Sequence, residues 1–415
     1  MIDGTGQGAR REVRRETKVI GLVGGAFLVH HFLQLALPPL FPLLKIEFQV
    51  SYAALGGIMT AFSLASAAAQ IPVGFLVDRV GARWVLMGGL GLASASLALI
   101  AATSSYTAFL ALAVVMGAAN SACTPADYAI LSSSIARARA GRAFSLHTFA
   151  GQVGFVLAPA TMGLLAAWGG WRMAVVAAGV LGLLAVAALI VGRGLLVEGT
   201  PHTASTEAPP ADRREPVPEK GGFALLLSPP ILLFLLFFIL NSSASTGIRT
   251  FSVTAMMAFH ESSLTVANAA LTGYFVGTST GVLAGGWLAD RVRRYDLPMA
   301  CVVLPGVAVL ALLGGYVLPG VGLIAAVVFF GLTQGVMRPL RDVLIMLATP
   351  PGSFGKVRAF VNMGGHVGSA VIPVFLGWLI DQGEPQWVFW TIAAGILLAI
   401  GTIFIVHPMV KIERR

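Results

Sequence analysis

The chain has 415 residues, of which 57% are hydrophobic and 11% are charged. Ordinary soluble domains carry about 25% charged residues, so this composition excludes a soluble globular protein. The formal net charge of +9 does not indicate a nucleic-acid partner, because the basic residues recur in the segments between apolar runs.

The apolar runs are long enough to cross a bilayer, since about 20 residues span its roughly 30 Å hydrocarbon layer. They are centred near residues 30, 65, 94, 121, 156, 181, 243, 277, 307, 335, 370 and 397. The N-terminus carries acids as well as arginines and no cleavable signal pattern, so we expect the first run to direct insertion. The sequence therefore predicts an all-α membrane protein with twelve transmembrane helices.

The middle of the chain interrupts the apolar runs with the segment VEGTPHTASTEAPPADRREPVPEKGG, residues 197–222. A stretch so rich in Pro, Ala, Thr and charge cannot bury enough apolar surface to fold, and is typical of a linker. The predicted organisation is an N-terminal tail (1–17), a six-helix bundle (18–192), a cytoplasmic linker (193–224), a second six-helix bundle (225–407) and a C-terminal tail (408–415).

The basic residues predict the orientation of the chain. If both termini are cytoplasmic, nearly all lysines and arginines outside the apolar runs lie on the cytoplasmic side, and only Lys45 and Arg172 do not. This is the positive-inside distribution. We therefore expect a multi-pass protein of the plasma (inner) membrane with both termini in the cytoplasm.

The two halves repeat each other. The heptapeptide GFLVDRV from Gly74 matches GWLADRV from Gly286 at an offset of 212. Gly117 matches Gly331, and GQVGFVLAP from Gly151 matches GHVGSAVIP, both at an offset of 214. Because each half has an even number of spans, the repeats are expected to be parallel, an arrangement known for the halves of major facilitator transporters.

The first of these loops resembles the signature loop of the major facilitator superfamily, and the span count, linker and repeat extend the resemblance to the whole chain. The resemblance implies two bundles around a central cavity and transport by alternating access. It also implies a conformational latch at the cytoplasmic ends of helices 2 and 8, formed by Gly74, Asp78, Arg79, Gly81, Arg83, Asp290 and Arg291. Arg293 and Tyr295 replace Gly81 and Arg83 in the second copy, which predicts a weaker latch there.

Five charged residues lie inside the apolar runs, where each costs roughly 2.5–3.5 kcal/mol on an insertion scale. They are Asp127 in the fourth run, Arg249 in the seventh, and Arg338, Arg341 and Asp342 in the tenth. The resemblance places these helices, with the first, around the cavity. An arginine guanidinium binds carboxylate or phosphate, so the three arginines favour a small organic anion as substrate. The predicted binding residues are Arg249, Arg338, Arg341, His31, Gln34, Asn241, Ser245 and Asn120.

The pairing of these charges is also predicted. Arg338 and Asp342 are one helical turn apart and can pair, and the repeat relates Asp127 to Arg341, which leaves Arg249 as the unpaired cation. Proton coupling requires a group that changes charge, and the candidates are Asp127, Asp342 and His30, with His31, His147 and His366 as further titratable residues. The alternative is that all five charges form a closed structural network and that the substrate is neutral or hydrophobic.

Other signals bear on the class of protein. The run beginning at Gly151 resembles the antiporter motif of the family but has Ala158 and Met162 where glycines are expected, and the first run resembles fosmidomycin-resistance-type members. No nucleotide-binding loop or catalytic constellation occurs, so we expect no enzyme activity and no cofactor. The Met and His residues at 256–260 form too loose a metal site. We expect a monomer that binds protons, lipid and a small, anionic molecule. A multidrug or antibiotic exporter and a membrane ligand sensor that transports nothing remain the alternatives.

Overall fold

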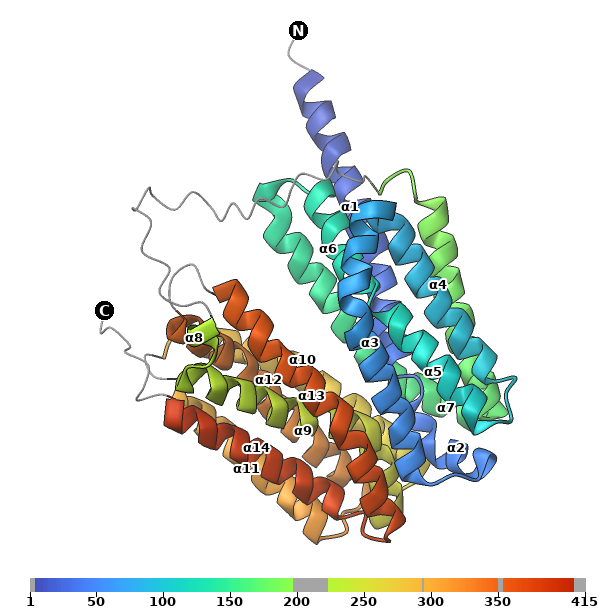
Figure 1. Ribbon diagram of the computed structural model, residues 1–415, viewed down its shortest axis with the longest axis vertical. Coiled ribbons are helices and arrows are strands. Elements are labelled where there is room, and N and C mark those ends of the chain that lie inside the picture. The colour runs from blue at the N-terminus through green and yellow to red at the C-terminus, as the bar shows by residue number, and fades with distance from the viewer. Residues whose placement is uncertain (1–3, 197–222, 293–294, 350–353, 407–415) are drawn as a thin grey trace. The chain divides into compact units, whose positions relative to one another are not determined.

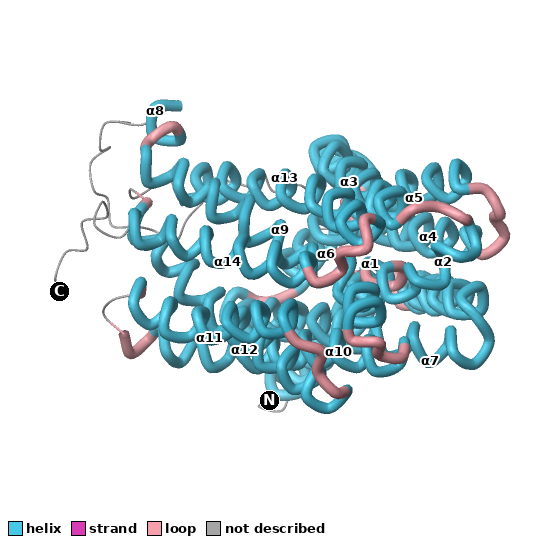
Figure 2. Tube along the Cα trace, turned by 90° about the horizontal axis from the view of Figure 1, so that it is seen from below, coloured by secondary structure: helices cyan, strands magenta, loops and turns pink. Residues whose placement is uncertain are grey.

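The computed structural model describes residues 4–196, 223–292, 295–349 and 354–406, which are built from helices joined by short loops (Figure 1; Figure 2). No strand occurs in these ranges. Helices satisfy their backbone hydrogen bonds internally, as a lipid environment requires. The all-α prediction is therefore confirmed for the described residues. Most of the predicted linker (197–222) and the C-terminal tail (408–415) lie outside them.

The helices form two compact units, Met1–Leu40 with Ala61–Pro209 (unit 1) and Phe41–Thr60 with Pro210–Arg415 (unit 2). Unit 1 holds α1 (Gly4–Gln34), η1 (Pro38–Leu40), most of α3 (Tyr52–Val80), α4 (Ala82–Ile100), α5 (Tyr106–Asn120), α6 (Cys123–Ser134) and α7 (Arg137–Val191). Unit 2 holds α2 (Phe41–Phe48), the first turns of α3, α8 (Phe223–Leu226), α9 (Pro229–Phe259), α10 (Leu264–Ala289), α11 (Asp296–Gly315), α12 (Gly320–Ala348), α13 (Phe354–Asp381) and α14 (Trp387–Val406).

Ten helical segments of the described chain are long and apolar enough to cross a membrane. α7 counts once among them, although its 55 residues would extend about 80 Å as one straight helix. Its backbone leaves helical geometry at Gly169 and at Gly170, whose φ of 80° favours glycine. α10, with 26 residues, is not among the ten.

Matched glycines make the same kind of helix crossing in each unit. A Cβ on Gly154 of α7 would lie 2.1 Å from the Leu28 carbonyl oxygen of α1, and one on Gly368 of α13 would lie 2.2 Å from that of Ile239 in α9. These crossings depend on the absence of a side chain, because interiors have no room for an added methyl group. The internal repeat read from the sequence therefore corresponds to repeated packing.

The same holds for the pair Gly117 and Gly331. A Cβ on Gly117 of α5 would lie 2.3 Å from the carbonyl oxygen of Phe62 in α3, and one on Gly331 of α12 would lie 2.2 Å from that of Tyr274 in α10. Two independent positions of the sequence repeat thus have equivalent structural roles.

Unit 2 includes a helical hairpin from the first half of the sequence, formed by α2 and the start of α3. Asp381, at the end of α13, accepts hydrogen bonds from the backbone N–H groups of Tyr52 and Ala53, both at 2.9 Å, and lies 3.4 Å from the Lys45 ammonium. A carboxylate at a helix N-terminus satisfies free N–H groups and interacts favourably with the helix dipole. Asp381 therefore fixes the start of α3 on α13.

Helix α1 includes most of the segment predicted as an N-terminal tail. α1 begins at Gly4, so much of the segment predicted as a tail (1–17) is helical. The buried carboxylate of Glu16 accepts from the backbone N–H of Ala136 at 3.1 Å and pairs with the Arg139 guanidinium at 2.5 Å. This contact joins α1 to the start of α7.

Candidate functional site

Most of the predicted binding residues of unit 2 lie along facing sides of α9 and α12. We refer to Asn241, Ser245 and Arg249 of α9 with Gln334, Arg338 and Arg341 of α12 as the arginine strip. The α9 members recur every four residues and the α12 members every three or four, so each set occupies one face of its helix.

Packing on the other sides of α12 determines where this face points. Gly331 and Gly335 of α12 contact α10, and Thr333 contacts Gly306 of α11. On a helix with about 100° per residue, Gln334 lies about 100° from both Thr333 and Gly335, and Arg338 lies between Gln334 and Gly331, on the α10 side of that face. Arg341 from the same face lies over the Phe238 ring of α9 at 4.9 Å, so this face is directed toward α9.

The charge pairs in unit 2 differ from those expected. Asp342 pairs with Arg341 at 2.9 Å and with Arg358 of α13 at 2.8 Å, and not with Arg338. Both paired guanidinium groups also lie over Phe238, at 4.9 and 5.5 Å. The expectation that Asp342 orients Arg338 is therefore wrong, because the neighbouring Arg341 and the more distant Arg358 compete successfully for the same carboxylate.

Arg249 and Arg338 exchange the roles that we expected for them. Arg249 donates to the backbone oxygen of Ser245 at 3.0 Å and to the hydroxyl of Thr246 at 3.3 Å, so its guanidinium is held in place. Arg338 has no hydrogen bond or ion pair with any residue in the described ranges, and it lies within electrostatic range of both Arg249 and Arg341. Among the described members of the arginine strip, the guanidinium without a partner is therefore that of Arg338.

The depth of each residue in the strip follows from one contact. Successive spans joined by short loops alternate in direction, so α9 and α12 are antiparallel. The contact between Phe238 and Arg341 sets the register. Three residues after Phe238 is Asn241, and three residues before Arg341 is Arg338. Four residues further along each helix are Ser245 and Gln334. Because both helices rise 1.5 Å per residue, the members of each pair lie at about the same depth.

Unit 1 contains a buried acid–base pair. Asp127 of α6 and His147 of α7 are 0% and 1% exposed, and His147 Nε2 lies 3.2 Å from Asp127 Oδ2. The second carboxylate oxygen and the second ring nitrogen have no partner among the described residues. The Phe27 ring stacks on His147 at a centroid distance of 3.9 Å. The sequence predicted Asp127 as a site residue with Arg341 as its partner, and that pairing, between residues of different units, stays a prediction.

The other predicted polar residues of unit 1 form a hydrogen-bonded chain across three helices. Gln34 Nε2 of α1 lies 3.1 Å from His30 Nε2 and donates to Asn120 of α5 at 2.7 Å, and Asn120 donates to Ser66 of α3 at 3.1 Å. His31 bonds instead to the backbone oxygen of Phe27 at 3.0 Å. These side chains satisfy one another, which is how buried polar groups avoid a desolvation penalty.

The predicted latch residues lie at helix ends. Gly81, between α3 and α4, has a φ of 98°, a conformation that favours glycine. Asp78 is exposed and has no ion pair with a described residue. A Cβ on Gly74 would have no atom of the described residues outside its own helix within 4 Å. In the second copy, Arg291 lies over the Trp287 ring at 3.8 Å. The latch itself stays a prediction.

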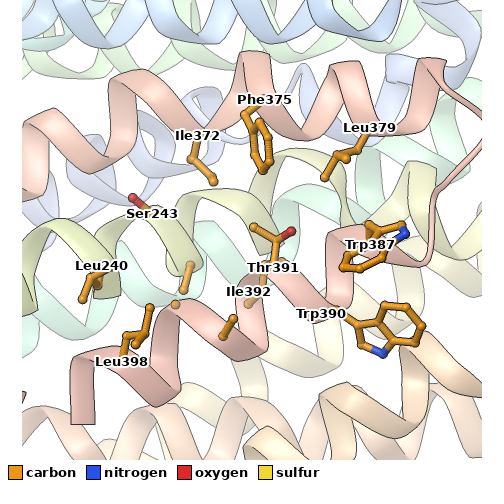
Figure 3. Close-up of a pocket in the computed structure, with 13 residues that line it drawn as sticks. Leu240, Ser243, Ile372, Phe375, Leu379, Trp387, Trp390, Thr391, Ile392 and Leu398 are labelled. Atoms are coloured by element: carbon orange, nitrogen blue, oxygen red, sulfur yellow. The ribbon is translucent and has the colours of Figure 1, made fainter. Parts of the chain in front are cut away.

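A separate cavity of about 680 Å³ lies among α9, α13 and α14 of unit 2 (Figure 3). It is lined mainly by apolar side chains, among them Phe375, Trp387 and Trp390. Of its three α9 residues, Leu240 and Ser243 lie on the side of that helix opposite to the arginine strip, and Ala244 lies about 100° from the strip. None of the predicted binding residues lines it.

Comparison with known proteins identifies the family. A model of the Major Facilitator Superfamily matches residues 23–262 and 241–414, which together cover most of the sequence. The chain belongs to the Major Facilitator Superfamily. It is thus a multi-pass membrane protein, and the family predicted from the signature loop is confirmed.

Relatives within the superfamily are distant. The probable L-galactonate transporter of Escherichia coli (strain K12) is 27% identical over 206 residues, which are 49% of this chain and 44% of that protein. The fosmidomycin resistance protein of the same strain is 29% identical over 152 residues, 36% of each chain. The chain thus aligns with less than half of either protein. The likeness to fosmidomycin-resistance-type members predicted from the first run is nevertheless supported.

A solved structure shows the shared fold. A variant of the nucleoside transporter NupG superimposes with a TM-score of 0.77 at 14% identity, covering 94% of this chain and 99% of that one. Identity this low carries over the architecture of the Major Facilitator Superfamily and not the ligand.

Three site residues were missed or undervalued in the sequence. Gln334 precedes Arg338 by one helical turn, and this spacing was available as a signal. His147 was only one of several titratable histidines, since nothing in the sequence pairs it with Asp127. Arg358 was assigned to the cytoplasmic positive charge, because its approach to Asp342 depends on the crossing of α12 and α13.

Proposed function

We propose that the protein is a secondary active transporter that moves a small organic anion across the plasma (inner) membrane by alternating access, coupled to protons. Arg338 is its principal anion-binding group. The observation that carries the proposal is the excess of positive charge around the arginine strip. The described residues there include one carboxylate, Asp342, and four arginines, Arg249, Arg338, Arg341 and Arg358. A partly buried excess of positive charge is costly without an anion.

The architecture that we propose is twelve spans in two parallel six-helix repeats, with both termini cytoplasmic, acting as a monomer. The break in α7 at Gly169 and Gly170 supports two spans in that segment, and the length of α10 supports a further one. The matched glycine crossings support the repeat.

The relatives support the anion class. L-galactonate, named for one relative, is a carboxylate at neutral pH. The proton carrier in our proposal is Asp127, whose burial beside His147 allows a proton to be held between the two side chains. His30 and Asp342 are less suited. His30 accepts a hydrogen bond from an amide, and Asp342 is neutralised by two arginines.

A second candidate function is that of a multidrug or antibiotic exporter acting as a proton antiporter. The apolar cavity beside Trp387 and Trp390 favours it, as does the fosmidomycin resistance protein among the relatives. A membrane sensor that binds its ligand without transport is the third candidate. Drug export predicts that replacement of Arg338 has little effect, and a sensor predicts no flux.

Uptake by the full-length protein in proteoliposomes tests these candidates. Labelled L-galactonate is offered with and without an imposed pH gradient. We expect gradient-stimulated uptake that Arg338→Met abolishes and that Arg193→Met, at the exposed end of α7, leaves unchanged. Absence of uptake of any carboxylate, with transport of hydrophobic drugs intact, contradicts the proposal.

A further inference from the structure

Two side-chain amides of the arginine strip have a buried atom without a hydrogen-bond partner among the described residues. Gln334 is 4% exposed, and its Nε2 has no hydrogen-bond partner among the described residues. The Oδ1 atom of Asn241 is also buried and equally without a partner in those ranges. A buried polar group left unpaired is destabilising, so such groups are rare in native structures and indicate a missing partner.

The positions of these amides relate them to Arg338. Gln334 is one helical turn from Arg338 on the same face of α12, where side chains are neighbours about 5–6 Å apart. Asn241 lies at about the depth of Arg338 on the facing side of α9, by the register that the contact between Arg341 and Phe238 sets. Gln334 and Arg338 thus lie on one face of α12, with Asn241 at a similar depth on α9.

Arg338, Gln334 and Asn241 each need a different kind of binding partner on a ligand. The guanidinium of Arg338 requires an anion and matches a carboxylate with two parallel hydrogen bonds. The Gln334 amide nitrogen requires an acceptor, and the Asn241 amide oxygen requires a donor. A hydroxyl group provides both a donor and an acceptor, so hydroxyls beside a carboxylate satisfy the whole set.

Among the described residues of the arginine strip, one guanidinium lacks a hydrogen bond or ion pair, which favours an anion with one carboxylate. Arg341 is engaged by Asp342, and Arg249 is held by Ser245 and Thr246. One available guanidinium suits a carboxylate better than a phosphate dianion, which requires a second donor cluster. A simple aliphatic carboxylate satisfies Arg338 but leaves both amides unpaired.

We propose that this site selects small polyhydroxylated monocarboxylates, with Arg338 binding the carboxylate and Gln334 and Asn241 binding hydroxyl groups. The inference rests on the proposed function and specifies its substrate class. A site built to bind a substrate hydroxyl rejects the analogue that lacks it, because its own polar groups then stay unpaired.

Three probes of equal chain length separate these contributions. Gluconate has the carboxylate and hydroxyls, hexanoate has only the carboxylate, and glucitol has only the hydroxyls. Thermal unfolding of the purified full-length protein, followed over a range of probe concentrations, gives an apparent affinity for each. The variants are Gln334→Leu, Gln334→Glu and Arg338→Met, with Gln382→Leu as the control at an exposed glutamine.

We expect gluconate to stabilise the wild type and the control, and hexanoate and glucitol to bind at least tenfold more weakly. Gln334→Leu replaces the amide with an apolar side chain of similar size. It is expected to weaken gluconate binding roughly tenfold and to leave hexanoate binding unchanged. Gln334→Glu places a carboxylate beside Arg338 and is expected to abolish binding of both acids. Arg338→Met has the same expected effect.

Equal binding of gluconate and hexanoate, unaffected by Gln334→Leu but lost in Arg338→Met, overturns this inference and leaves the anion proposal standing. Failure of every carboxylate to stabilise the wild type overturns both. Gluconate binding that survives Arg338→Met also overturns the inference, because the carboxylate then binds elsewhere.

Discussion

In unit 1, the buried carboxylate of Asp127 faces His147, and the amides of Gln34 and Asn120 hydrogen-bond to each other. In unit 2, a single carboxylate, Asp342, is shared by two arginines, and the amide nitrogen of Gln334 has no partner within the described chain. The two interiors differ although matched glycines pack the helices of both units. Matched helix crossings therefore accompany two different polar interiors, which in our proposal hold a proton in unit 1 and bind an anion in unit 2.

The largest loss of stability is expected from disrupting the acid–base pair of unit 1. His147→Leu leaves the Asp127 carboxylate buried without its partner, which is expected to destabilise the protein by about 3 kcal/mol. The measurement is the unfolding temperature of the purified protein in detergent. His366→Leu, at an exposed histidine of α13, is the control.

A double variant separates lost pairing from lost packing. Asp127→Asn combined with His147→Leu removes the charge that was left unpaired and is expected to recover much of the lost stability. If the double variant is as unstable as the sum of the two single variants, the pair contributes only by packing.

The shared scaffold gives the next largest effect, which is expected to be similar in the two units. Gly368→Ala places a methyl group against the carbonyl oxygen of Ile239, and Gly154→Ala does the same against Leu28. Each is expected to destabilise by about 2 kcal/mol through overpacking. Gly365→Ala on the same helix, where a Cβ has its nearest contact at 3.8 Å, is the matched control. A large effect in only one unit contradicts equivalent packing.

The smallest effect concerns pH and a residue at a helix end of unit 2. His260 follows the last residue of the α9 span, is 5% exposed, and accepts a hydrogen bond at Nδ1 from the backbone N–H of Leu318 at 3.1 Å. Burial lowers the pKa of His260 below its ordinary 6.5. The unfolded chain therefore binds a proton that the folded chain excludes, so stability is complete above about pH 6.5 and decreases as pH falls below it.

The variant His260→Gln tests this dependence. Unfolding temperatures measured between pH 5 and 8 are expected to fall less steeply toward acid in the variant than in the wild type. An unchanged slope assigns the acid sensitivity to other groups.

Composition, charge asymmetry and the repeat were sufficient to predict the family and the helical membrane architecture, because hydropathy and the signature loop are local properties of the sequence. Helical spacing also placed Arg338 and Arg341 on one face. Pairing was not predictable in this way. Whether Asp342 binds Arg338, Arg341 or Arg358 depends on helix crossings and rotamers, and so does the choice between His147 and Arg341 as partner for Asp127.

In our proposal, unit 2 binds the anion at Arg338 and unit 1 carries the proton at Asp127. The most direct test is proton movement recorded by a pH-sensitive dye inside proteoliposomes when L-galactonate is added, alongside exchange of labelled L-galactonate in the same vesicles. We predict that Asp127→Asn retains exchange but loses proton movement, whereas Arg338→Met loses both. Proton movement in Asp127→Asn equal to that of the wild type, or exchange that persists in Arg338→Met, contradicts this division of roles.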